Sequence, residues 1–151
     1  MRREDRKISL AEGINILIKA EYGVLSMTTP DSKGYGVPLN FVIKENNLYF
    51  HCAPEGSKLD YLRNNNKVSF CAVGNTKLLH EKFGTIYESV IVNGKISEIE
   101  GEEKRAALLL FVEKYSSEYI SEGNEYIDRF YEKVKIIKLT SDSITGKARR
   151  Q

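Results

Sequence analysis

The sequence predicts one domain that is mainly β-structure, an antiparallel sheet or small barrel with peripheral helices. Extended segments outnumber helical ones, and short turns join most of them. No regular alternation of strand and helix, which would be typical of a parallel sheet, is present. The 151 residues fit a single domain over 1–151, and a hydrophobic share of 41% can fill its core.

The N-terminal part of the chain predicts a helix followed by a strand. Ser9 and Glu12 fit a capping box at the start of a helix over residues 9–20. Residues 23–28 are typical of a strand, and residues 30–34 are typical of a turn. Apolar residues recur at helical spacing within the first of these segments: Leu10, Ile14, Leu17 and Ile18.

The next segment predicts a hairpin and a short helix. Residues 35–44 are extended and mostly apolar, and the polar turn 45–47 leads into a strand over 48–53. We therefore expect one hairpin over 35–53. A helix over 57–63 should follow it.

The second half of the chain predicts two further strands, two helices and a last strand. A strand over 67–73 precedes residues 74–85, which lack clear periodicity and predict a long loop. Residues 87–99 are typical of one strand, in which Gly94 indicates a bulge or bend. The remaining elements are two helices and a strand, predicted over 102–115, 119–131 and 134–144.

The charge balance argues against general nucleic-acid binding. Lys and Arg number 23 and Asp and Glu number 21, which gives a formal charge of +2. Basic residues nevertheless gather at the two ends of the chain: Arg2, Arg3, Arg6 and Lys7, then Lys147, Arg149 and Arg150. Such groups are either solvated tails or parts of a site.

The cysteines and the hydropathy pattern predict a cytoplasmic protein with reduced thiols. Cys52 and Cys71 each lie in an apolar, strand-like run. No secretory signal and no apolar segment long enough for a membrane is present, so we expect no membrane association. No CxxC, HxH or HExxH motif occurs, and the sequence therefore singles out no metal site.

The junction between residues 48–50 and the helix from Ser57 is a candidate anion site. A helix that begins just after a strand presents unpaired N–H groups and the positive end of its dipole. His51, Ser57 and Lys58 can add donors, so a cofactor phosphate is the anion to expect. Plainer interpretations also stand, because Ser57 and Asp60 fit a capping box and Lys58 can be an exposed lysine. His51 can equally be a structural histidine.

Pro38 marks a second candidate site within residues 35–41. Proline cannot donate a ladder hydrogen bond, so it implies an edge, a bulge or an opening in the sheet. A ligand ring could lie against such an opening and bond to the backbone groups that the ladder leaves free. A plain edge strand explains Pro38 equally well.

The chain is poor in recognisable catalytic groups. It has no Ser-His-Asp order with a nucleophile elbow, no paired carboxylates in an apolar frame and no Walker loop. If the protein is an enzyme, the reactive chemistry is expected to belong to a cofactor. The protein would then bind that cofactor, orient it and exclude water.

Seven short runs resemble a known family: MRREDR at 1–6, EYGVL at 21–25, YGVPLNF at 35–41, LYFHCA at 48–53, GSKLD at 56–60, YESV at 87–90 and TGKAR at 145–149. Together and in this order they resemble the nitroimidazole-resistance branch of the pyridoxamine 5'-phosphate oxidase-related flavoproteins. The resemblance covers nearly the whole chain.

This resemblance implies a split β-barrel that binds FMN, with two equivalent flavin sites at the interface of a homodimer. It places the flavin phosphate at four residues: His51, Ala53, Ser57 and Lys58. It places the ring along one strand: Val37, Pro38, Leu39, Asn40 and Phe41. It also implies contributions from the partner subunit through residues like these: Tyr87, Ser89, Lys147 and Arg149.

The resemblance further implies redox chemistry. Its branch is linked to reduction of nitroimidazoles to amines, with NAD(P)H or another donor reducing the flavin and a small-molecule acceptor taking the electrons. The chain has no Trp and lacks the C-terminal Arg-Leu-x-Pro motif of the vitamin-synthesising oxidase, so pyridoxamine phosphate oxidation is not implied. The alternatives are a non-catalytic barrel that binds flavin or haem, with His51 as axial ligand, and an interaction protein with an empty barrel.

Overall fold

A computed structural model describes residues 3–150; residues 1, 2 and 151, among them the predicted basic residue Arg2, lie outside the described range. Within that range the strands are β1 (Lys7–Ile8), β2 (Tyr22–Thr28), β3 (Gly34–Asn40), β4 (Val42–Lys44), β5 (Asn47–Cys52), β6 (Lys67–Leu79), β7 (Gly84–Ile99) and β8 (Lys135–Arg149). The α-helices are α1 (Leu10–Lys19), α2 (Ser57–Asn64), α3 (Gly101–Tyr115) and α4 (Ile120–Phe130). Short 3₁₀ turns lie at Glu4–Arg6, His80–Lys82, Ser117–Tyr119 and Tyr131–Lys133.

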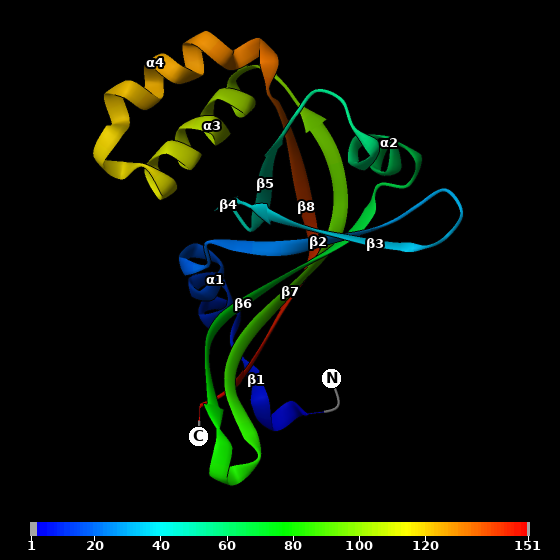
Figure 1. Ribbon diagram of the computed structural model, residues 1–151, viewed down its shortest axis with the longest axis vertical. Coiled ribbons are helices and arrows are strands. Elements are labelled where there is room, and N and C mark those ends of the chain that lie inside the picture. The colour runs from blue at the N-terminus through cyan, green and yellow to red at the C-terminus, as the bar shows by residue number, and fades with distance from the viewer. Residues whose placement is uncertain (1–2, 151) are drawn as a thin grey trace.

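The strands form one antiparallel sheet in the order β3-β2-β6-β7-β8-β5-β4, and β1 pairs with β8. The outermost strands of this order, β3 and β4, are consecutive in the chain and separated only by Phe41. The sheet therefore curls back on itself as a split barrel (Figure 1). The predicted antiparallel, mainly β fold with peripheral helices is confirmed.

Aromatic side chains fill the barrel interior. Phe41, Phe50 and Phe70 are fully buried. The ring centroid of Phe70 lies 4.7 Å from that of Phe41 and 5.3 Å from that of Phe50. Burial of one such side chain stabilises the fold by about 1.5–3 kcal/mol. Since the three rings come from the β3–β4 break, β5 and β6, they hold the two sides of the barrel together.

The helices cover different parts of the barrel. The pair α3 and α4 packs on the outer side of β5 and β8, whereas α2 lies across the barrel from this pair (Figure 1). The buried residues under the helix pair form a second core: Val42, Tyr49, Ile99, Ala107, Leu108, Phe111, Ile127 and Ile136. No helix between residues 3 and 150 combines the length and the apolar character needed to cross a membrane.

Several local predictions are confirmed. Ser9 caps α1, because its hydroxyl accepts from the Glu12 N–H at 3.2 Å while the Glu12 carboxylate accepts from the Ser9 N–H at 2.9 Å. The ladder between β7 and β8 shifts register between Asn93 and Gly94, at the predicted bulge. The helices over α2, α3 and α4 also lie where the sequence predicts them.

The predicted hairpin over 35–53 is only partly correct. β4 and β5 do form a hairpin, whose turn residues Glu45 and Asn46 have φ of 51° and 64°. This left-handed pair matches the twist of two-residue hairpins. β3, however, pairs with β2 and not with β5. The ladder breaks at Phe41, where the chain crosses from one side of the barrel to the other.

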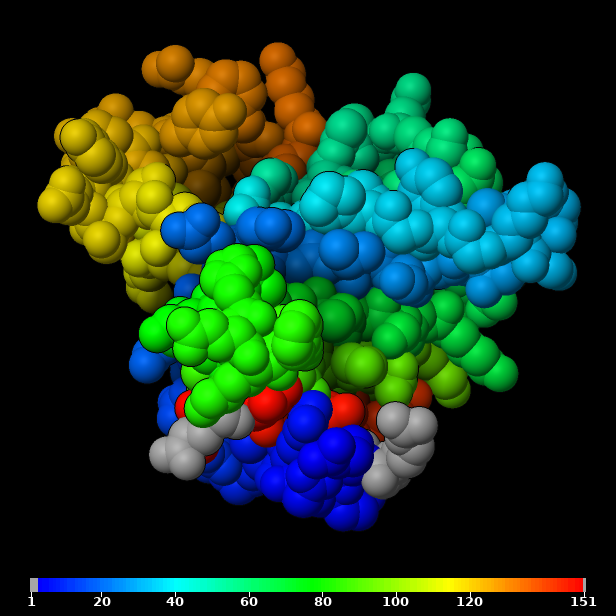
Figure 2. Space-filling view, turned by 60° about the horizontal axis from the view of Figure 1, so that its bottom comes forward, coloured from blue at the N-terminus to red at the C-terminus, as the bar shows by residue number. Residues whose placement is uncertain are grey.

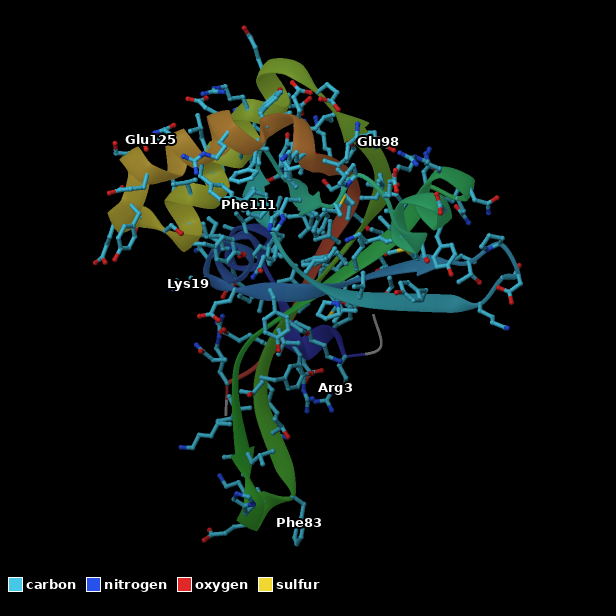
Figure 3. The ribbon with its side chains drawn as sticks, turned by 45° about the horizontal axis from the view of Figure 1, so that its top comes forward. Arg3, Lys19, Phe83, Glu98, Phe111 and Glu125 are labelled. Carbon is cyan, nitrogen blue, oxygen red and sulfur yellow. The ribbon has the colours of Figure 1, made fainter. Side chains whose placement is uncertain are left out.

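The predicted loop over 74–85 is wrong. β6 and β7 continue through this segment as a protruding hairpin, closed by the turn at His80–Lys82. Both faces of this hairpin are largely solvated, so no apolar alternation marks it in the sequence. Phe83 lies at its tip and is 98% exposed (Figure 3).

The interpretation of the basic ends as solvated tails is also wrong for the described residues. Lys7 pairs with Lys147 across β1 and β8, and β8 continues to Arg149. Arg150 reaches back to the Glu12 carboxylate at 2.8 Å. β1 and the last part of β8 lie side by side at the base of the hairpin, as seen from below in Figure 2.

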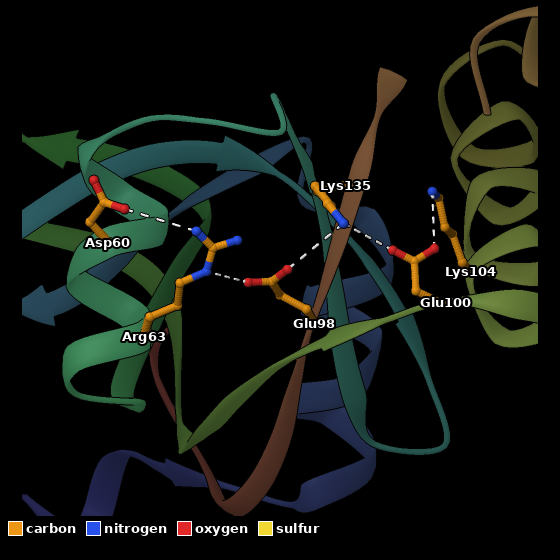
Figure 4. A network of polar contacts seen from close by, with 6 residues as sticks. All are labelled: Asp60, Arg63, Glu98, Glu100, Lys104 and Lys135. Atoms are coloured by element: carbon orange, nitrogen blue, oxygen red, sulfur yellow. Dashed lines mark hydrogen bonds and ion pairs between the residues drawn. The ribbon is translucent and has the colours of Figure 1, made fainter. Parts of the chain in front are cut away.

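A chain of ion pairs connects α2 to the helix pair (Figure 4). It runs from Arg63 through Glu98 at 2.7 Å to Lys135 at 4.0 Å, then to Glu100 at 3.1 Å and Lys104 at 3.3 Å. Lys104 is 2% exposed, and its ammonium lies 4.2 Å from the centre of the Tyr131 ring. Individual exposed pairs contribute only about 0–1 kcal/mol, but a network orients the elements that it joins.

Candidate functional site

The N-terminus of α2 is a set of open hydrogen-bond donors. Its N-cap is Gly56, at φ 143°, and no side chain within residues 3–150 caps the helix. The N–H groups of Leu59 and Asp60 both donate to the Gly56 carbonyl. Because Gly56 is the N-cap, Ser57 does not cap its own helix. The Ser57 hydroxyl and the N–H groups of Ser57 and Lys58 are therefore available to a ligand.

Lys58 places a positive charge at the same junction. Burial lowers the pKa of His51, and the charge of Lys58 lowers it further. Burial raises the pKa of Cys52, and Lys58 acts against that rise. Lys58 is half-buried and forms no ion pair with a described residue. The junction thus holds one cation, a histidine biased towards its neutral form and a buried free thiol.

His51 points away from the barrel core. Its neighbours on β5, Phe50 and Cys52, face the interior, so the period of the strand turns His51 outward. Its ring meets Phe111 of α3 edge-on, with centroids 4.9 Å apart and an interplanar angle of 79°. His51 therefore lies between the start of α2 and the helix pair.

A cavity of about 550 Å³ lies between β5 and the α3–α4 pair. We call it the helix-pair cavity. Three of the predicted cofactor residues contribute to it, namely Asn40, His51 and Ala53. Phe111 of α3, labelled in Figure 3, also lines it. The remaining lining residues are mostly apolar or aromatic: Cys52, Leu108, Val112, Tyr115, Ser116, Tyr126, Ile127, Phe130, Lys133 and Val134.

The strand break at Phe41 is closed by two residues of α3. The Phe41 N–H donates to the Tyr115 hydroxyl at 3.0 Å, and the Phe41 carbonyl accepts from the Lys114 ammonium, also at 3.0 Å. The Tyr115 hydroxyl lies 2.6 Å from the Glu21 carbonyl, to which it can donate. Burial lowers the pKa of Lys114 to about 8. The backbone groups released at this break are thus already bonded within the protein.

β3 is an edge strand, as Pro38 predicts. Pro38 pairs with Val24 of β2, and no described strand follows β3 on its other side in the sheet order. Val37 and Leu39 pack against the barrel core, while Pro38 and Asn40 lie on the outer face. Phe41, the last residue of the predicted ring contact, is buried inside the barrel with both backbone groups bonded to α3. A ligand ring along this strand would meet its outer face.

The remaining predicted site residues gather elsewhere. Tyr87 lies opposite Arg149, and Ser89 lies opposite Lys147, across β7 and β8. The Tyr87 hydroxyl accepts from Arg6 at 3.5 Å, a hydrogen bond that lowers the pKa of Tyr87. This group sits at the hairpin end of the barrel, at the opposite end from α2 (Figure 1). One chain does not bring the two groups together.

The aromatic residues that α3 and α4 supply to the cavity were not predicted from the sequence. Phe111 and Tyr115 follow one face of α3, and Tyr126 and Phe130 lie one turn apart on α4, with ring centroids 4.5 Å apart. Their spacing predicts an apolar helix face, which is usually core. Only the packing of the helix pair against β5 leaves a cavity between them.

The family model for pyridoxamine 5'-phosphate oxidase matches residues 9–148. The chain belongs to the pyridoxamine 5'-phosphate oxidase family. A candidate 5-nitroimidazole antibiotic resistance protein from Bacteroides thetaiotaomicron VPI-5482 is 31% identical, with a TM-score of 0.80 over 93% of this chain and 85% of that one. The predicted family and its nitroimidazole-resistance branch are thereby confirmed.

Solved structures of lower sequence identity share the fold. A FAD-binding protein from Mesorhizobium loti is 21% identical, with a TM-score of 0.65 over 95% of this chain and 97% of that one. A FAD- and haem-binding protein from Mycobacterium smegmatis is 13% identical, with a TM-score of 0.83 over 97% of this chain and 74% of that one. A comparison with curated proteins finds no match.

Proposed function

We propose that this protein is an FMN-dependent oxidoreductase that holds the flavin phosphate at the start of α2. The observation that carries the proposal is the uncapped N-terminus of α2 with Lys58 beside it. A helix N-terminus and a charged amine together suit a phosphate. The Ser57 hydroxyl supplies a further donor, and His51 stands close enough for its pKa to respond to Lys58.

The flavin ring would lie along the outer face of β3. Pro38 and Asn40 are exposed there, and the edge position of β3 leaves that side open. Asn40 also lines the helix-pair cavity. A ring on this face would therefore border the cavity, and the flavin would supply the electron transfer. The protein residues would bind it, orient it and exclude water.

A homodimer would complete the site. Tyr87, Ser89, Lys147 and Arg149 are separated from α2 within one chain, but a second copy could bring its own set to this junction. Two equivalent sites would result, as a two-fold interface requires. In this proposal NAD(P)H would be the electron donor to the flavin, and a small molecule would be the electron acceptor.

Lys58→Ala tests the phosphate site. Losing a charge-assisted contact should cost about 1.5–3 kcal/mol, roughly a 10- to 150-fold rise in the FMN Kd. Quenching of flavin fluorescence by purified protein measures it. Lys95→Ala is the matched control, since Lys95 is an exposed lysine on β7. An unchanged Kd in Lys58→Ala, or no FMN bound by the wild-type protein, would refute this site.

Haem is the second candidate ligand, and the position of His51 favours testing it. The imidazole is biased towards its neutral form and faces a cavity of about 550 Å³. A neutral imidazole is an axial haem ligand. Titration with haemin should give a Soret shift that His51→Ala removes if haem binds there. A spectrum that is identical for wild type and His51→Ala would exclude axial ligation by His51.

A further inference from the structure

Lys114 of α3 is a half-buried amine that the proposed flavin chemistry does not use. Its Nζ lies 3.0 Å from the Phe41 carbonyl and 3.5 Å from the Leu17 carbonyl. No carboxylate within residues 3–150 forms an ion pair with it, and the centre of the Phe41 ring lies 4.0 Å away. The two carbonyls satisfy both N–H groups of a neutral amine, so the lone pair of the amine is left unbonded.

Lys114 also lines a cavity of about 380 Å³ where the ends of α1, β3 and α3 meet. The charged residues of its lining are Lys19, Glu21 and Lys114, so cationic groups outnumber the carboxylate. Lys19, labelled in Figure 3, is exposed at this cavity. The other lining residues are Ile18, Asn40 and Tyr115. The cavity therefore attracts a small anion to the side of the amine.

Burial makes this amine a nucleophile near neutral pH. It lowers the pKa of Lys114 to about 8. The titratable groups that share the cavity are Lys19 of α1, Glu21 before β2 and Tyr115 of α3. At pH 7.5 about a quarter of the molecules carry a neutral amine, against about one in a thousand for an ordinary lysine. Desolvation activates lysine nucleophiles in this way.

We propose that Lys114 is a site of N-acylation by small acyl phosphates that enter this cavity. The amine lone pair attacks the acyl carbon, a C–N bond forms, and the bond from that carbon to the phosphate oxygen breaks. Hydrogen phosphate leaves with one amine proton, and a neutral amide remains on the lysine. The cavity is formed by one chain and without flavin, so this modification does not depend on the proposed function.

Acylation should loosen the closed strand break at Phe41. The amide keeps one N–H, so one of the two carbonyl contacts is lost, together with the charge beside the Phe41 ring. Treated wild-type protein should therefore unfold at a lower urea concentration than untreated protein. Lys114→Arg, which cannot be acylated at this position, should shift less under the same treatment. Equal shifts in the two proteins would overturn this effect on the fold.

Acetyl phosphate is the probe for the reaction, and peptide mass spectrometry follows the acetylated fraction of each lysine with time. At pH 7.5 Lys114 should react about tenfold faster than Lys95, an exposed lysine on β7 that is the internal control. In urea that unfolds the chain, the two lysines should react at similar rates. An equal or slower rate at Lys114 in the folded protein would overturn the proposal, as would a preference that persists in urea.

The pH profile of the same reaction tests the state of the amine. The rate at an ordinary lysine rises about tenfold for each pH unit until about pH 10.4. The rate at Lys114 should instead level off above about pH 8, because the amine is then already neutral. A rate at Lys114 that rises in parallel with that at Lys95 would contradict an amine activated by burial.

Lys19→Met tests the attraction of the anionic reagent. It should slow acetylation of Lys114 by acetyl phosphate about three- to tenfold. Acetylation by the uncharged N-hydroxysuccinimide ester of acetic acid should not change, because that reagent gains nothing from the charge of Lys19. Equal loss with both reagents, or with neither, would overturn the assignment to acyl phosphates.

Discussion

The two ends of the barrel differ in what surrounds their polar side chains. At the α2 end, which comprises the start of α2, His51 and the helix-pair cavity, burial is the first cause of the pKa shifts of His51 and Cys52. At the hairpin end, a hydrogen bond between side chains is the first cause of the pKa shift of Tyr87. Arg6 lowers the pKa of Tyr87 in this way.

This difference separates two kinds of binding surface. The α2 end is apolar and partly shielded from water, so it suits a ring and strengthens any charge interaction inside it. The hairpin end is basic and solvated, so it suits the polar periphery of a ligand. A flavin with its phosphate needs both kinds of surface. This contrast is consistent with the proposed homodimer, in which the α2 end of one subunit and the hairpin end of the other would hold one flavin.

If the proposed homodimer forms, exchange of subunits between two variants should change flavin binding strongly. Lys58→Ala alters the α2 end and Lys147→Ala alters the hairpin end. Each homodimer should lose FMN affinity by about 1.5–3 kcal/mol. Mixed dimers should regain one intact site, so random exchange should restore about a quarter of all sites. Flavin fluorescence quenching before and after mixing measures this.

Two outcomes would contradict shared sites. Restoration would be absent if all contacts to one flavin came from one chain. Full affinity in the Lys147→Ala homodimer would show that the hairpin end does not contribute. Size-exclusion chromatography at matched concentrations tests whether each variant forms the proposed dimer.

Gly56→Ala tests whether the α2 end depends on backbone conformation. Gly56 has φ 143°, a region open to glycine almost alone, and an added Cβ would meet nothing within 4 Å. The substitution should therefore cost about 1–3 kcal/mol through backbone strain and not through a clash. Urea unfolding measures it. Gly34→Ala is the control, because its Cβ also meets nothing and no positive φ is required there. Equal effects would remove the argument that α2 needs its glycine cap.

The sequence predicts the elements that bury a face and misses those that do not. Ser9 with Glu12 predicts the start of α1, and the polar turn at 45–47 predicts the β4–β5 hairpin. Residues 74–85 carry no such signal, because their hairpin is solvated on both faces. Pairing between distant strands, such as β3 with β2, depends on barrel closure and leaves no local pattern.

Within the candidate site, too, contacts between residues close in sequence could be predicted and contacts between distant residues could not. His51 and Lys58 are close in sequence, so their junction can be predicted from a strand followed by a helix. Tyr115 and Lys114, in contrast, are far from Phe41 in the sequence. Tyr115 accepts a hydrogen bond from the Phe41 N–H although the two residues are 74 positions apart. Contacts of this kind arise from tertiary packing. The closed strand break therefore could not be predicted from the sequence.

Burial of Lys114 makes the free energy of unfolding depend on pH. Its pKa is lowered from 10.5 to about 8 by burial. The unfolded chain therefore binds more protons between about pH 8 and 10.5, and stability should rise with pH across this window. Lys114→Met should lack the rise, which solvent screening limits to about 1 kcal/mol or less. Urea unfolding at pH 7.5 and 10 measures the difference between the two proteins. Parallel changes in both would show that Lys114 is not the group responsible.

Phe83→Ser tests whether the tip of the β6–β7 hairpin contacts a second subunit. The side chain is 98% exposed, so its loss should change the unfolding free energy of a dilute, monomeric sample by no more than about 0.5 kcal/mol. If the hairpin end contacts a second subunit, the same substitution should weaken dimerisation by more than that, because a buried aromatic anchor is lost. Sedimentation equilibrium beside urea unfolding separates the two effects. A dimer that is unaffected by Phe83→Ser would place the interface away from the hairpin tip, and the shared site would then have to form through Tyr87 and the end of β8.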